Sequence, residues 1–149
     1  MRVVIQRVKR ASVVVEGESA GEISQGLVVL LCAMQNDSLE DREYIIKKVP
    51  ELRIFADDNG KLNRSLIDVK GEILLISQFT LAAQTKKGRR PYFADAAEPE
   101  QARKSIEIVA KIWRKMGIKV EQGFFGVMME VNLINDGPVT IWIDSKNRE

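Results

Sequence analysis

The stretch Leu27–Ala33, which reads LVVLLCA, is an unbroken apolar run that directly follows Gly26. A short apolar run without polar alternation is typical of a strand that other elements cover on both faces. The run is far shorter than the roughly 20 residues that a membrane-spanning helix needs. It therefore predicts a buried strand of a layered fold.

Further strands are predicted on either side of this run. The valine-rich segments Val3–Val8 and Ser12–Glu16 favour extended backbone, because β-branched side chains pack well on a pleated surface. Residues 16–21 are typical of a turn that leads back into Glu22–Ser24, so a hairpin is expected there. The other predicted strands are Leu52–Phe55, Glu72–Leu81, Ile118–Gln122, Val127–Ile134 and Val139–Asp144.

Two helices are predicted between the strands. Ser38 followed three residues later by Asp41 indicates a capped helix start, and Pro50 marks the end of that helix or a kink in it. Pro99 suits the first turn of a second helix, and Gly117 suits the position just past its end. The apolar stripe of the second helix is expected to consist of Ala102, Ile106, Val109, Trp113 and Met116. These elements predict the mixed α/β class, with curved, barrel-like sheets and two main helices packed on one side in three layers.

Length and composition set the class of protein. The chain has 149 residues, of which 45% are hydrophobic and 30% charged, as expected of one soluble domain covering residues 1–149. Its formal net charge of +2 does not by itself indicate a nucleic-acid partner. Charges interrupt the opening residues, MRVVIQRV, too early for a signal peptide, so we expect a cytoplasmic protein that does not bind membranes.

The absence of one residue type narrows the chemistry. The sequence contains no histidine, which excludes Ser-His-Asp and Cys-His catalytic arrangements and removes the commonest metal ligand. Its single cysteine, Cys32, excludes an internal disulfide and a Cys-x-x-Cys site. An enzyme of this composition must rely on backbone groups, hydroxyls, carboxylates or a group of the substrate.

Two polar stretches interrupt otherwise apolar segments. Residues 77–81, SQFTL, follow the apolar run Ile73–Ile76, and they are either a strand that emerges into water or hydrogen-bonding groups with a function. Residues 135–140, NDGPVT, are either an ordinary hairpin turn or a turn whose Gly137 lets a ligand approach the backbone closely.

A third stretch is strongly basic. Lys86, Lys87, Arg89 and Arg90 place four positive charges within five residues. This basic run is either a solvated loop or a patch that contacts phosphates.

SQFTL and NDGPVT, in this order and at this separation, strongly resemble the signature motifs of the D-aminoacyl-tRNA deacylase family, once called D-tyrosyl-tRNA deacylase. The resemblance covers essentially the whole chain and extends to Gln6-Arg7-Val8, Ala11-Ser12-Val13, Gly26-Leu27, Phe55-Ala56-Asp57, Gly60-Lys61, Gly88-Arg89-Arg90-Pro91 and residues 123–129, GFFGVMM. It implies cleavage of the ester between a D-amino acid, or glycine mischarged on tRNA-Ala, and the terminal ribose of tRNA, with L-aminoacyl-tRNA spared. It also implies a homodimer in which each subunit inserts a cis Gly-Pro turn into its partner's pocket, and it implies no cofactor or metal.

The resemblance further implies roles for single residues. Gly137 and Pro138 would accept the substrate's α-ammonium on their carbonyl oxygens, and Arg7, otherwise a surface charge on a strand, would support their turn. Phe125 and Met129, otherwise core side chains, would line the pocket near the adenine end, and Val127 would belong to the pocket wall. Val127 stands where the family commonly has alanine. The residues expected to contact the tRNA backbone are Lys86, Lys87, Arg89 and Arg90.

Two routes to ester cleavage remain open. Thr80 is a candidate nucleophile by resemblance, although no base stands beside it in the sequence. In the route that we favour, the substrate's own 2′-hydroxyl assists, while Gln78 and backbone N–H groups near Phe79 hold the ester carbonyl. Ser77 belongs to the same set of expected catalytic residues. The alternatives to a deacylase are a non-catalytic RNA-binding dimer that uses the basic run and an unrelated esterase or amidase with Thr80 as nucleophile.

Overall fold

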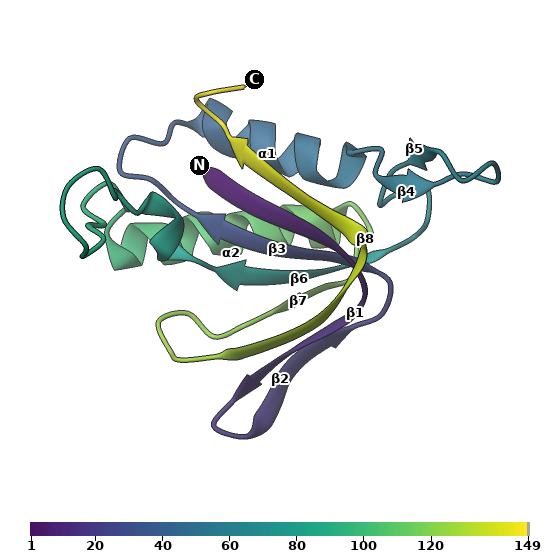
Figure 1. Cartoon of the computed structure of the whole chain (residues 1–149), viewed down its shortest axis with the longest axis horizontal. Coiled ribbons are helices and arrows are strands. Elements are labelled where there is room, and N and C mark those ends of the chain that lie inside the picture. The colour runs from purple at the N-terminus through teal and green to yellow at the C-terminus, as the bar shows by residue number, and fades with distance from the viewer. Residues whose placement is uncertain (149) are drawn as a thin grey trace.

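The computed structural model describes residues 1–148. Six strands form one curved sheet: β1 (Arg2–Val15), β2 (Glu18–Ile23), β3 (Gly26–Cys32), β6 (Glu72–Ser77), β7 (Val120–Gln122) and β8 (Glu130–Asp144). The order is β2–β1–β3–β6–β7, and β8 also pairs with β1 (Figure 1). The sheet is mixed, because β1 is antiparallel to its three neighbours whereas β6 is parallel to β3 and β7.

Two helices cover one face of this sheet (Figure 1). They are α1 (Leu39–Glu51) and α2 (Pro99–Lys115), and across their contact the indole Nε1 of Trp113 donates a hydrogen bond of 2.9 Å to the carbonyl of Ile46. Side chains of the sheet and of both helices share one main core. The predicted α/β class with two helices on one side is therefore confirmed. No helix within residues 1–148 has the length and apolar character of a transmembrane segment.

β3 is buried on both faces, as its unbroken apolar sequence predicts. Leu27, Val29 and Leu31 belong to the main core beneath the helices. Val28 belongs to a second core on the opposite face, where β2 and the adjoining ends of β1 and β8 curve over the sheet. The second core consists of Val8, Ala11, Val13, Ile23, Val28, Leu74 and Ile76.

The first two strands differ from the prediction in their limits. The segments Val3–Val8 and Ser12–Glu16 are parts of the single strand β1, because Arg10 between them pairs with β8. The turn before β2 contains only Glu16 and Gly17, which have φ angles of 50° and 84°. β2 therefore begins earlier than predicted.

Two other predicted elements are wrong at their ends. The strand predicted at Leu52–Phe55 is reduced to β4 (Phe55–Ala56), because only these two residues pair with β5 (Leu62–Arg64) in a separate hairpin. Met116 leaves the predicted apolar stripe of α2 and is 45% exposed. The reason is that the helix ends at Lys115 and Gly117 turns the chain at a φ of 85°.

The strand predicted at Glu72–Leu81 ends at Ser77. The backbone N–H of Gln78 still donates to the carbonyl of Leu31 on β3, at 2.9 Å. The N–H of Leu81 then donates to the carbonyl of Gln78, at 3.2 Å, and Phe79–Ala82 form a short 3₁₀ helix, η1. The chain turns here because the local hydrogen bonds of η1 replace the sheet ladder.

Residues 135–140 do not form the turn between two separate strands that the sequence predicts. Both halves of β8 pair with β1 in the same direction, so the chain continues instead of reversing. Asn135 lies opposite Val8 and Thr140 lies opposite Gln6, so five steps along β8 match two steps along β1. The segment is thus an enlarged β-bulge, at which Pro138 has no N–H to donate to a ladder.

The start of α1 is capped as predicted. The N–H of Asp41 donates to the Ser38 hydroxyl at 3.2 Å, and the N–H of Ser38 donates to the Asp41 carboxylate at 2.8 Å. The Ser145 hydroxyl, which follows β8, donates to the same carboxylate at 2.7 Å. Burial raises the pKa of Asp41, but the hydrogen bonds from Ser145 and Ser38 outweigh burial and hold the pKa at about 2.

Replacing Asp41 by asparagine is expected to lower the free energy of unfolding by about 2 kcal/mol at neutral pH. Because the ordinary pKa is 3.8 and the folded value about 2, the carboxylate stabilises the fold fully above its ordinary pKa. This contribution is lost as the pH falls through the folded value. In urea unfolding at a series of acidic pH values, the free energy of unfolding of wild type should fall toward that of Asp41→Asn as the pH is lowered. Asp58→Asn, which alters a carboxylate that is 87% exposed, serves as the control. If the plots of unfolding free energy against pH for wild type and Asp41→Asn run parallel, Asp41 is not the carboxylate responsible.

Candidate functional site

The bulge of β8 presents Gly137 and Pro138 to solvent. The bond between them is cis, as the resemblance implies. The side chain of Asn135 closes the bulge from inside: its Oδ1 accepts from the N–H of Val139 at 3.0 Å, and its Nδ2 donates to the Val139 carbonyl at 3.3 Å. The bulge therefore has a defined shape that does not depend on a ligand.

Arg7 lies directly behind this bulge and is only 9% exposed. Its Nε donates to the carbonyl of Asp136 at 3.0 Å and lies 3.3 Å from the Asp136 carboxylate. Its Nη1 donates to the carbonyl of Ile54 at 2.6 Å, before β4. A buried guanidinium is tolerated when its donors are satisfied in this way. Arg7 is thus a strut between β1, the bulge and the segment that follows α1, and not the surface charge that its strand position alone suggests.

The SQFTL segment lies at the carboxyl end of β6. Ser77 and Gln78 are half-buried, whereas Phe79 and Thr80 are exposed. The Nε2 of Gln78 donates to the hydroxyl of Thr80 at 2.5 Å. Within residues 1–148 this amide is the only side chain hydrogen-bonded to Thr80, and an amide is not a base. Thr80 therefore lacks the partner that would activate a nucleophile.

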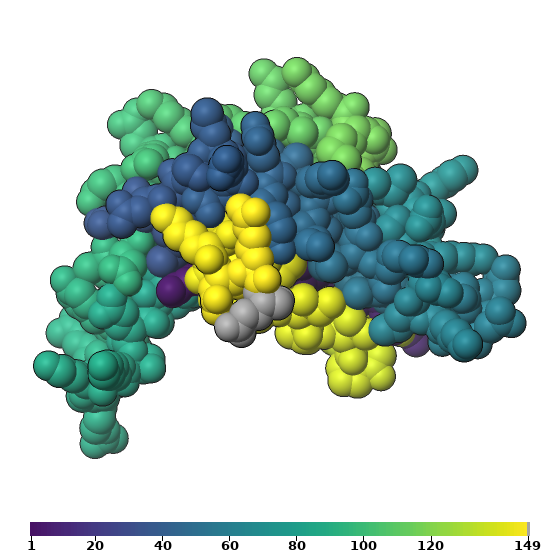
Figure 2. Space-filling view, turned by 90° about the horizontal axis from the view of Figure 1, so that it is seen from above, coloured from purple at the N-terminus to yellow at the C-terminus, as the bar shows by residue number. Residues whose placement is uncertain are grey.

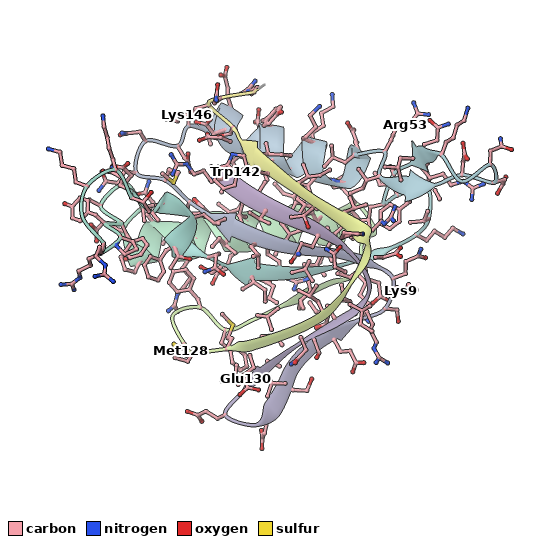
Figure 3. The ribbon with its side chains drawn as sticks, viewed as in Figure 1. Lys9, Arg53, Met128, Glu130, Trp142 and Lys146 are labelled. Atoms are coloured by element: carbon pink, nitrogen blue, oxygen red, sulfur yellow. The ribbon has the colours of Figure 1, made fainter. Side chains whose placement is uncertain are left out.

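A cavity of about 390 Å³ lies beside Ser77. Its wall includes Phe125, which is half-buried, and the backbone of Gly123. Met129 packs against the second core, and its sulfur fills the space that a side chain on Gly123 would need. Val127 is 45% exposed and does not line the cavity. Figure 3 shows Met128 on the same loop, between β7 and β8, and Trp142 toward the other end of β8.

A larger cavity, of about 540 Å³, lies between the start of α1 and the start of α2. It contains none of the site residues predicted from the sequence. Cys32, the single cysteine, does not supply a reactive thiol either, because burial raises its pKa to about 11 and the group stays protonated. The candidate chemistry therefore concentrates at the bulge of β8 and around Ser77.

These two groups lie far apart within one chain. Gly137 lies beside Arg7, which pairs with Leu27 of β3, and Leu27 pairs with Ile73 of β6. Ser77 is four residues farther along β6. At about 3.3 Å per residue and about 4.8 Å per strand, three strand steps and four residues separate Gly137 from Ser77 by roughly 20 Å. Along the curved sheet, the bulge and the SQFTL segment of one chain therefore lie well apart.

The basic run forms an exposed loop. The backbone hydrogen bonds between Gln84 and Tyr92, at 2.8 and 3.1 Å, close its base. All four cations of Lys86–Arg90 are exposed, and none of them forms an ion pair within the described part of the chain. Figure 2 shows this teal-green segment projecting from the body of the molecule. Its charges are available to a partner.

Three residues of these regions are missing from the sequence-based prediction. Asn135 and Asp136 shape and anchor the bulge, and their position before Gly-Pro is a signal that could have revealed them. Arg103 of α2 lines the cavity beside Ser77, with its guanidinium carbon 5.1 Å from the centre of the Phe125 ring. No local signal marks Arg103, because this contact joins segments distant in sequence.

Comparisons with known proteins agree along the whole chain. The family model described as D-Tyr-tRNA(Tyr) deacylase matches residues 4–144. A protein of Bacillus pumilus (strain SAFR-032) named D-aminoacyl-tRNA deacylase is 53% identical over 98% of this chain and 99% of its own length. A protein of Thermosipho melanesiensis with the same name is 52% identical over 98% of each chain.

Two solved structures share the architecture. One, titled "c-Myc DNA Unwinding Element Binding Protein", has a TM-score of 0.91 and 39% identity, and the match covers 97% of this chain and 98% of the other. The second, titled as a probable eukaryotic D-amino acid tRNA deacylase, has a TM-score of 0.81 over 95% and 97% of the chains, and its 16% identity shows a shared fold alone. From the family match and the identities with its relatives, this chain belongs to the D-Tyr-tRNA(Tyr) deacylase family.

Proposed function

We propose that this chain, acting as one domain, hydrolyses the ester bond of D-aminoacyl-tRNA and releases the free D-amino acid and tRNA, while L-aminoacyl-tRNA is spared. The family and the names of its relatives support the reaction. One structural observation carries the selectivity: the exposed Gly137–Pro138 bulge, held from behind by the buried Arg7.

The bulge acts as a filter for chirality. Backbone carbonyls of Gly137 and Pro138 accept the α-ammonium of the substrate. Once the ammonium and the ester carbonyl are both fixed, a D side chain points into open space and an L side chain collides with the bulge. Glycine has no side chain to reject, so glycyl-tRNA mischarged on tRNA-Ala is accepted as well.

The working enzyme is a homodimer. Because roughly 20 Å separates the bulge from Ser77 within a chain, the bulge of one subunit completes the site of its partner. β8 is suited to such contact, since among the described residues it pairs with β1 alone. It also carries exposed apolar side chains, with Ile134 43% and Trp142 51% exposed.

Positioning and the substrate's own hydroxyl drive the reaction. Gln78 and backbone N–H groups near Phe79 hold the ester carbonyl, and Ser77 lines the same site together with Phe125, toward the adenine end. The 2′-hydroxyl of the terminal adenosine orients a water molecule, which attacks the carbonyl carbon. The bond to the 3′-oxygen then breaks, and this oxygen takes up a proton as the carboxylic acid leaves.

The first experiment compares ester cleavage of tRNA charged with D-tyrosine and with L-tyrosine. EDTA is present throughout, so that any cleavage observed occurs without a free metal ion. Among residues 1–148, no group of three or more His, Cys, Asp or Glu side chains is placed to hold a metal. Loss of the D-ester alone is the expected result. If neither ester is cleaved, a non-catalytic nucleic-acid-binding role replaces this proposal. Cleavage of both esters would remove the bulge as the filter.

Neutralising the basic run should weaken binding of tRNA without changing selectivity. Replacing Lys86, Lys87, Arg89 and Arg90 by glutamine removes up to four phosphate contacts, so KM for D-tyrosyl-tRNA should rise by about tenfold or more at moderate salt. The ratio of D to L cleavage should stay constant. Four exposed cations elsewhere, Lys9, Arg10, Lys47 and Lys111, form the control set. A changed ratio of D-ester to L-ester cleavage would mean that the loop contacts the amino acid and not the tRNA backbone.

A further inference from the structure

Arg103 occupies an unusual position on α2. Its neighbours along the helix, Ala102 and Ile106, are buried in the main core, whereas Arg103 itself is exposed. Its guanidinium lies over the ring of Phe125, 5.1 Å from the centroid, at the wall of the 390 Å³ cavity that contains Ser77. An arginine stacked on an aromatic ring keeps its in-plane N–H donors available at a reduced entropic cost.

The charge of Arg103 is not used within the described chain. None of the ion pairs of residues 1–148 includes it, although Glu107 lies one helical turn away and lines the same cavity. The adjacent Lys104 differs on both counts. It pairs with Glu100 at 2.8 Å and lines the other cavity, between the starts of the helices.

The surroundings favour a phosphate as the ligand of Arg103. A planar guanidinium with free donors matches phosphate oxygens bidentately. Glu107 repels an anion at its own end of the cavity, so the charges orient a bound nucleotide with its phosphate toward Arg103. The loop that bears the basic run leads into the first turns of α2 (Figure 1), and Arg103 is the fifth residue of that helix.

We propose that Arg103 binds the phosphate that joins the terminal adenosine to the preceding nucleotide, and that it thereby positions the end of the RNA over the cavity beside Ser77. This inference rests on the proposed deacylase function, which brings the terminal adenosine to that cavity. Arg103 is a positioning residue, because it contacts RNA outside the reacting ester.

The test compares two model substrates that differ in this phosphate. One is the D-tyrosyl ester of the trinucleotide CCA, and the other is the D-tyrosyl ester of adenosine, which has no phosphate. Arg103→Ala should lower kcat/KM for the trinucleotide by about tenfold, mainly through KM, and leave the adenosine ester unchanged. Arg103→Lys, which keeps the charge without the planar stack, should recover part of the loss, and Lys104→Ala should match wild type.

Salt dependence and direct binding complete the test. The affinity of CCA without an attached amino acid is measured at several salt concentrations. The magnitude of the slope of log affinity against log salt should be smaller by about 0.7 in Arg103→Ala, as for one lost phosphate contact to a single strand. An equal loss of kcat/KM on both esters would mean that Arg103 only supports Phe125. An unchanged kcat/KM on both esters would mean that Arg103 does not contact the phosphate. Either result overturns the inference. If wild type cleaves neither ester but Arg103→Ala still loses trinucleotide affinity, the deacylase proposal fails and the phosphate contact stands.

Discussion

Replacing Gly137 by alanine is expected to reduce deacylation of D-tyrosyl-tRNA by at least about 100-fold, because small displacements of positioning groups have effects of this size. The added Cβ would lie 2.9 Å from the Cγ2 of Val139 and 3.0 Å from the Nη2 of Arg7. Arg7 cannot move away freely, since it is buried and bonded to Asp136 and Ile54. The φ angle of 131° at this position is itself one that L side chains rarely adopt. The backbone carbonyls that we propose as acceptors of the ammonium should therefore shift.

Single-turnover cleavage measures this loss, and sedimentation compares the oligomeric state of the variant with that of wild type. Gly117→Ala is the matched control: its φ of 85° imposes similar backbone strain, but nothing lies within 4 Å of the added Cβ and the residue is remote from the bulge. Normal turnover in Gly137→Ala would refute the role of the bulge. Equal losses in both variants would attribute the effect to general destabilisation.

A tRNA that ends in 2′-deoxyadenosine is expected to lose its D-amino acid about 100-fold or more slowly than normal D-tyrosyl-tRNA, the size of effect usual for a positioned proton-transfer group. The physical reason is that, among residues 1–148, the Thr80 hydroxyl has only the Gln78 amide as a side-chain partner, and an amide cannot act as its base. The substrate's 2′-hydroxyl must then orient the water. Rapid-quench cleavage of the two substrates, matched in sequence, measures the ratio.

Thr80→Ala provides the complementary measurement in the same assay. This variant should keep its rate within a few-fold of wild type, and Thr80→Ser should do the same. Loss of activity in Thr80→Ala, with the deoxy substrate still cleaved at the normal rate, would establish Thr80 as a nucleophile. Retained activity in Thr80→Ala therefore indicates assistance by the 2′-hydroxyl of the RNA, whereas its loss together with normal cleavage of the deoxy substrate indicates covalent catalysis.

The elements that local sequence determines were predicted well. All but the last residue of the run Leu27–Ala33 belong to the buried strand β3, as the run indicates, and the Ser38–Asp41 box starts α1. Strand propensity and helix capping depend on residues that are close together in the chain, so both can be predicted from the sequence alone. The resemblance based on SQFTL and NDGPVT likewise agrees with the family match.

The features that depend on partners distant in sequence were not predictable in this way. Asp-Gly-Pro favours a turn, but only pairing of both flanks with β1 decides that β8 continues as a bulge and not as a hairpin. The end of β6 at Ser77 and the burial of Arg7 beneath Asp136 are likewise tertiary effects. The distance between the two motifs of the candidate site, which lie at opposite corners of one sheet, likewise depends on strand order and cannot be derived from local sequence.

The bulge of β8 has a mechanical consequence. It is fixed at both ends by ladder pairs, at Asn135 and at Thr140, and is braced from behind by Arg7. A segment fastened on three sides behaves as a rigid stop, unlike a hinged lid, which must open and close in every cycle. In the proposed function, a stop of this kind rejects the wrong stereoisomer without any gating motion.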